Sequence, residues 1–223
     1  MTRDAALAAA YTTSVLLVLA WTYQSVGYSQ AVDPGQMLTT SGAVLLGAAA
    51  LGWMRPPRVG LTAPQAMLLL GAVGMSLGLV VDSRLTPLGT LASLCSRVEG
   101  GLWPMVRLHA SLLPWMHVGM WVGGLAAIPL LRAIRPACRT QYCARVFQNV
   151  ACSAWMTVGM SAGVLVSEYF VSQSGLRSAG SMLGGMFSGM VWGMVASVSL
   201  YRLYHRVRPV IACKLNQRRI GAL

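Results

Sequence analysis

Long apolar segments constrain the fold of this chain more than any other feature. Six of them occur, each close to the roughly 20 residues that a helix needs to cross the hydrocarbon core of a bilayer. Lipid offers no hydrogen-bond partners, so each segment must satisfy its own backbone groups as a helix. The expected spans are 5–25, 37–54, 64–81, 104–131, 147–167 and 181–204. They predict an all-α bundle of six transmembrane helices.

Composition excludes an ordinary soluble protein. Only 10% of the 223 residues are charged and 56% are apolar, whereas soluble domains have about 25% charged residues. No polar stretch approaches the roughly 50 residues of a small soluble domain. The chain therefore divides into a transmembrane domain, residues 1–204, and a basic tail, residues 205–223.

The distribution of basic residues predicts the orientation of the spans, because cytoplasmic loops carry an excess of Lys and Arg. With the N-terminus in the cytoplasm, most of the 17 basic residues fall on that side, beside one acid, Asp4. The other side is neutral, with Arg84, Arg97, Arg107 and Arg177 against Asp33, Asp82, Glu99 and Glu168. We predict that both termini are cytoplasmic, in a plasma membrane and more specifically a bacterial inner membrane.

The basic tail has two interpretations. One is attraction to anionic lipid headgroups, which contributes about 1 kcal/mol per basic residue near the surface. The other is docking of a partner. Nucleic acid is not expected, because no aromatic residues alternate with the charges and no nucleic-acid-binding fold accompanies them. The residues concerned are Arg202, Arg206, Arg208, Lys214, Arg218 and Arg219.

The loop at 83–103 is longer than the others, and its apolar residues recur at helical spacing from Leu88 to Val98. This pattern predicts a short amphipathic helix that lies on the outer membrane surface. Pro104 would then begin the fourth span, at a position that proline tolerates. A second proline, Pro114, lies inside that span and predicts a kink.

Groups for acid–base catalysis are scarce. The chain has five Asp and Glu residues and three His, and it has no phosphate-binding loop, zinc-protease motif or nucleophile elbow. We therefore expect that it is not an enzyme. A proton-driven transporter usually has a carboxylate within the membrane, whereas we expect Asp82 and Glu168 near the outer ends of their helices.

Methionine is frequent, with 14 residues, and many lie at helical spacing. Thioether, thiolate and imidazole groups suit soft ions such as Cu(I). Taken as one helix, 104–131 carries several of these groups within a stripe about 60° wide, at about 100° per residue. The candidate metal ligands are Met105, His109, Met116, His117, Met120, Cys152, Met156 and Met160; the sixth span adds Met182, Met186, Met190 and Met194. Packing is the alternative, because methionine also fills gaps between helices.

Small residues at four-residue spacing mark three of the spans. They allow two helix backbones to approach closely. The longest such edge, a glycine zipper, consists of Ser181, Gly185, Gly189 and Gly193; shorter ones are Gly159 with Gly163, and Gly71, Gly74 and Gly78. These edges pack either within the bundle or against another chain, which includes a second copy.

One pair of motifs is similar to part of a known family. Met156-x-x-x-Met160 is followed one helix later by the glycine edge at 185–193. This arrangement resembles that of the eukaryotic high-affinity copper transporters, which have a methionine pair on one helix and glycines on the next. The resemblance covers these two motifs alone, since this chain has six expected spans rather than three and no methionine-rich outer tail. It implies copper as the cofactor or cargo.

Two functional hypotheses follow. In the first, the protein handles or translocates a soft metal ion, with copper favoured, along the candidate ligands. In the second, it is a non-catalytic membrane subunit or assembly factor that packs against partner membrane proteins or a second copy. Membrane lipids are partners in both.

Overall fold

The computed structural model describes residues 3–26, 34–54, 62–87, 102–134, 142–174 and 179–220, and every regular element within these ranges is a helix. The helices are α1 (Arg3–Val26), α2 (Pro34–Met54), α3 (Ala63–Leu85), α5 (Leu102–Leu112), α6 (Pro114–Ile134), α7 (Tyr142–Ser174) and α8 (Ala179–Ile220). All except α5 contain a segment long and apolar enough to cross a membrane. The six expected spans are thus present, as in a multi-pass membrane protein.

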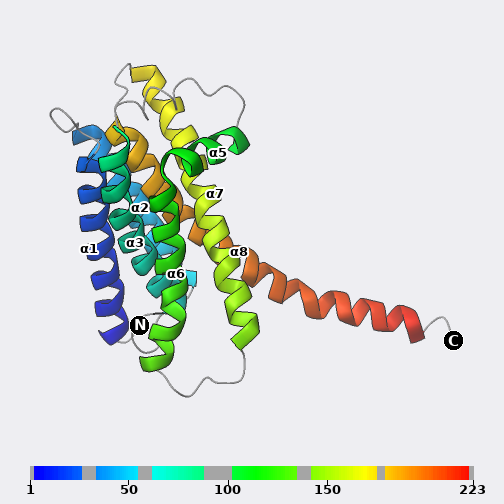
Figure 1. The fold of residues 1–223 in the computed structure, drawn as a ribbon. Helices are drawn as coiled ribbons and strands as arrows, with labels where there is room; N and C mark the ends of the chain where they lie inside the picture. The colour runs from blue at the N-terminus through cyan, green and yellow to red at the C-terminus, as the bar shows by residue number, and fades with distance from the viewer. Residues whose placement is uncertain are drawn as a thin grey trace.

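The spans pack side by side as an upright bundle (Figure 1). The two most extensive contacts join α3 to α6 and α7 to α8. Helix α8 also contacts α1, α2 and α3, so the last helix of the chain packs against the first three. An even number of spans puts Arg3 and Tyr204 on the same side of the membrane. That this side is the cytoplasm stays a prediction.

The expectation of one helix over 104–131 is wrong. The helix ends at Leu112 and a new one begins at Pro114, so that the membrane span covers only Pro114–Leu131. Proline has no N–H to continue the ladder of backbone hydrogen bonds. The chain changes direction here, and α5 points away from the axis of α6 (Figure 1). Pro129, by contrast, lies inside α6 without ending it.

Two further predictions concern the segment 88–98 and the basic tail. The amphipathic helix expected between Leu88 and Val98 lies outside the described residues. The basic tail continues α8 as a helix to Ile220, beyond the end of the membrane span at Tyr204. This part of α8 projects from the bundle (Figure 1).

Glycines set the distance between helices in both main pairs. On α3 and α6, a Cβ on Gly74 would collide with the carbonyl oxygen of Gly119, and one on Gly78 would collide with that of Trp115. On α7 and α8, a Cβ on Gly159 would meet the carbonyl oxygen of Gly189. The obstacles are backbone atoms, so any larger residue must push the helices apart.

Methionine dominates the interior. Ten methionines belong to the buried core, and none is more than 2% exposed. They are Met67, Met75, Met116, Met120, Met156, Met160, Met182, Met186, Met190 and Met194. Sulfur atoms from α3, α6, α7 and α8 therefore fill much of the space between the helices.

Candidate functional site

Asp82 lies where the chain breaks between α5 and α6. Its side chain is 1% exposed. One carboxylate oxygen accepts a hydrogen bond from the backbone N–H of Met116 at 2.7 Å, and the other accepts one from Trp115 at 3.3 Å. The first N–H groups of a helix lack partners within it, and a negative charge at that end also interacts favourably with the helix dipole. Asp82 of α3 thus caps α6 from across the bundle.

His117 lies three residues into α6 and is 9% exposed. Its Nδ1 is 2.8 Å from the carbonyl oxygen of Leu113. A carbonyl can only accept, so Nδ1 carries the proton and Nε2 carries the lone pair. Nε2 is buried and has no hydrogen-bond partner among the described residues. Histidines that bind metals typically have this arrangement, in which the other ring nitrogen donates to a carbonyl.

Two contacts between α6 and α7 give the register of these helices near His117. Trp121 donates through its indole N–H to the hydroxyl of Thr157 at 3.2 Å, and one turn later a Cβ on Gly124 would lie 3.1 Å from the hydroxyl oxygen of Ser153. The helices are therefore antiparallel here. His117 is one turn before Trp121 on the same face, at the level of Met160, which is fully buried.

Two pairs of methionines from different helices come together nearby. The buried hydroxyl of Tyr23 donates to the sulfur of Met116 at 2.7 Å and lies 3.9 Å from that of Met186. Further along the bundle, the position of a Cβ on Gly71 is 3.8 Å from Cγ of Met120 and 3.7 Å from Cε of Met156. The glycine thus leaves the space in which these two side chains meet.

The remaining candidate ligands are not brought to one point. His109 lies in α5, fully buried, and burial lowers its pKa to about 4, with a further contribution from His117. Met105 also lies in α5, but its side chain is not among those described. Cys152 accepts a hydrogen bond from the hydroxyl of Ser197 at 3.1 Å. Because the helix breaks at Leu113, the stripe expected to join Met105 and His109 to Met116 and Met120 on one helix does not exist.

A conventional metal site is absent from the described part of the chain, which has no group of three or more His, Cys, Asp or Glu residues suited to hold an ion. The soft side chains buried in that part are the thioethers, the thiol of Cys152 and the imidazoles of His109 and His117. Groups of this kind suit Cu(I) better than Mg²⁺ and Ca²⁺, which take oxygen ligands.

The other residues singled out in the sequence lie on α8. Gly185, Gly189 and Gly193 of α8 contact α7, and Ser181 lies at the beginning of the same helix. Arg202 is half-buried on α8. The side chains of Arg206, Arg208, Lys214, Arg218 and Arg219 are not among those described.

Sequence reasoning placed Asp82 near the end of its helix but missed that it caps α6, although a signal for this contact exists. Gly71, Gly74 and Gly78 form an edge on α3 that contacts α6. Asp82 follows Gly78 by four residues and therefore continues the same edge. An acid that extends a small-residue edge is expected to face the partner helix. Met186 belonged to the methionine repeat of the sixth span, but no signal in the sequence indicated that it and Tyr23 meet Met116 from α8 and α1.

Comparisons with known proteins add no further identification. No protein-family model matches the chain, and neither the curated proteins nor the solved structures contain a match.

Proposed function

We propose that this membrane protein binds a soft metal ion, with Cu(I) favoured, in the interior between α6 and α7. The observation that carries the proposal is the buried Nε2 of His117, which holds a lone pair and has no hydrogen-bond partner among the described residues. Leaving a buried acceptor without a partner costs about 1–3 kcal/mol. A metal ion that accepts this lone pair removes that cost.

The surrounding thioethers supply the other ligands. Met160 lies at the level of His117, and Met120 and Met156 meet a little further along the bundle. Met116 is one turn before Met120, and it converges with Met186 on the hydroxyl of Tyr23. Soft sulfur ligands select Cu(I), and successive sites of this kind along the bundle give an ion a route through it.

A titration with Cu(I) against a competing chelator tests the proposal. We expect the purified protein to bind in the sub-micromolar range, and His117→Gln and Met160→Leu to weaken binding by about tenfold or more, as loss of groups around a metal commonly does. Met67→Leu is the matched control, because Met67 is equally buried near the start of α3, at the opposite end of that helix from Asp82. A wild-type protein that binds no Cu(I), or equal binding by all four proteins, would contradict the proposal.

A second function, that of a membrane subunit that binds partner proteins, is favoured by the extension of α8. This helix continues from the span to Ile220 and projects from the bundle (Figure 1). Purification of the full chain from its native membrane tests this function. We expect a stoichiometric partner that is lost when Arg206, Arg208, Lys214, Arg218 and Arg219 are changed to Gln. If the protein purifies with bound copper and without a partner, the result would support metal binding and contradict the subunit function.

A further inference from the structure

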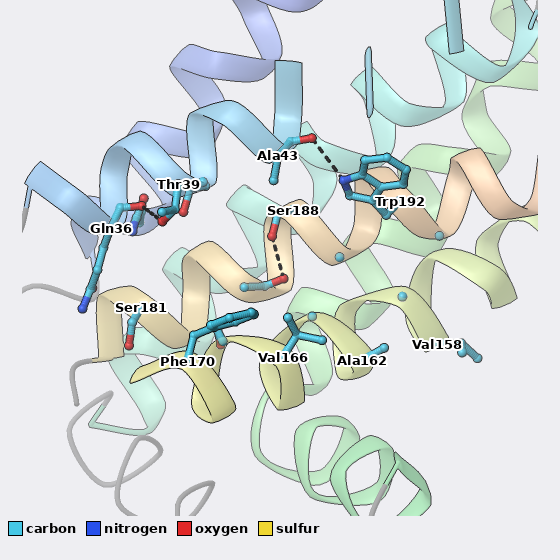
Figure 2. A pocket seen from close by; sticks show the side chains of 18 of the residues that line it. Gln36, Thr39, Ala43, Val158, Ala162, Val166, Phe170, Ser181, Ser188 and Trp192 are labelled. Carbon is cyan, nitrogen blue, oxygen red and sulfur yellow. Dashed lines mark hydrogen bonds between the residues drawn. The ribbon is translucent and has the colours of Figure 1, made fainter. Parts of the chain in front are cut away.

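A groove with a volume of about 710 Å³ lies between α2, α7 and α8. Helices α2 and α7 form its two walls and α8 forms its floor (Figure 2). Most of the residues that α7 and α8 contribute to the groove are Gly, Ala or Ser, so their side chains fill little of its space. Its size falls within the roughly 300–1,000 Å³ that is typical of small-molecule sites.

Polar side chains are concentrated at one end of the groove. Gln36 and Thr39 near the start of α2 and Ser181 at the start of α8 lie together at that end (Figure 2). The other end contains Val158 and Trp192, and the indole N–H of Trp192 already donates to a backbone carbonyl of α2 at 3.1 Å. The groove is therefore polar near the membrane surface and apolar toward the middle of the bilayer.

Charged side chains are absent from the residues described as lining the groove. Its polar groups are neutral amides and hydroxyls. Recognition of a phosphate group normally uses Arg or Lys. The polar end is thus suited to an uncharged head that exchanges hydrogen bonds.

The groove is accessible from the lipid, because side chains on its α7 wall are exposed. Val166 and Phe170 on that wall are 56% and 68% exposed. A hydrocarbon chain from the bilayer can therefore enter the groove along this open side.

We propose that this groove binds a neutral amphiphile, with an uncharged hydrogen-bonding head at Gln36 and Ser181 and one hydrocarbon chain directed toward Trp192. This site does not depend on the metal site, which lies on the other side of α7 from the groove. A monoacylglycerol is the simplest molecule of this class, and it serves as the probe below.

Fluorescence of Trp192 tests the site directly. We expect monoacylglycerol with a brominated chain to quench the wild-type protein at lower concentration than brominated phosphatidylglycerol does. Trp155 also lines the groove, so we expect the difference to shrink in Trp192→Phe and to disappear in the double variant that carries Trp155→Phe as well. Equal quenching by the two lipids, or a difference that persists in the double variant, would overturn the proposal.

Native mass spectrometry with matched variants supplies the second test. Ala162→Phe places a large side chain in the groove, whereas Ala49→Phe adds the same side chain on an exposed face of α2 outside it. We expect wild type and Ala49→Phe to retain bound monoacylglycerol and Ala162→Phe to lose it. Retention by Ala162→Phe, or preferential retention of phosphatidylglycerol by the wild type, would contradict the proposal.

Discussion

The two glycine-packed pairs, α3 with α6 and α7 with α8, are built by the same rule and differ in what surrounds the contact. In both, glycines let backbone atoms approach more closely than any side chain permits. Beside the first contact, Met116, Met120 and His117 fill the interior, and Asp82 closes its end. Beside the second, small residues such as Ala162 and Ser188 leave an open groove.

Small-residue edges therefore determine how closely two helices approach, while the neighbouring side chains determine whether the space beside the contact is filled or open. Long flexible methionines turn the space beside α6 into a closed, sulfur-rich interior. Ala and Ser cannot reach across the space beside α8. Four substitutions test these two contributions separately.

The largest effect is expected for Gly119→Ala. Its Cβ would collide with the carbonyl oxygen of Gly74, so the helices must separate and the methionine core must loosen. We expect the free energy of unfolding to fall by about 3 kcal/mol or more, the upper part of the range for overpacking. Gly42→Ala is the control, since nothing lies within 4 Å of the added atom. For Gly42→Ala we expect the free energy of unfolding to rise by up to about 1 kcal/mol, because alanine has a higher helix propensity than glycine. Unfolding in mixed micelles measures the stability of both variants. Equal changes in stability would refute the inference that close backbone contact requires glycine at position 119.

A smaller loss is expected for Asp82→Leu, which removes both hydrogen bonds to the start of α6. Hydrogen bonds to charged groups contribute about 1.5–3 kcal/mol. Asp82→Asn retains an acceptor oxygen, so its free energy of unfolding should fall less than that of Asp82→Leu. Hydrogen exchange at the amide of Met116 gives a local readout. We expect faster exchange there in Asp82→Leu, with unchanged exchange at Gly189 in the second pair. Equally faster exchange at Met116 and Gly189 would show that Asp82 stabilises the whole bundle rather than the start of α6.

Tyr23→Phe is expected to have a modest effect. The change removes the hydrogen bond to the sulfur of Met116 while preserving the ring contact with Phe187, whose centroid is 5.8 Å away. We expect a loss of about 0.5–1.5 kcal/mol in stability. Because the change frees a thioether, the affinity for Cu(I) should stay the same or rise. A drop in that affinity would indicate that the hydroxyl itself takes part in binding.

The smallest effect is expected for Ala162→Phe, because the groove has room for the added ring. We expect a change in stability within about 0.5 kcal/mol, as for a surface substitution. Ala127→Phe on α6 is the contrasting variant, because Ala127 is fully buried and overpacking should cost about 1–3 kcal/mol. Equal losses would mean that the space beside α8 is closed in solution.

The sequence alone determined the features that depend on local chemistry. Apolar length determined the six spans, since lipid forces each such segment to be a helix. Glycine spacing on α3, α7 and α8 indicated which faces approach a neighbour, because only those positions allow close backbone contact. The buried methionines were also visible as a pattern, although packing and metal binding produce the same pattern.

How these parts meet depends on contacts between helices. The break at Leu113 follows from Pro114, but the cap on α6 is Asp82, a residue of another helix that supplies the acceptor. The meeting of Met116 with Tyr23 and Met186 depends on how α1 and α8 are arranged around α6. The groove depends on the gap between α2 and α7, which are remote in sequence. Helical periodicity describes one helix at a time, whereas each of these features arises from side chains on at least two helices whose relative rotation the sequence does not state.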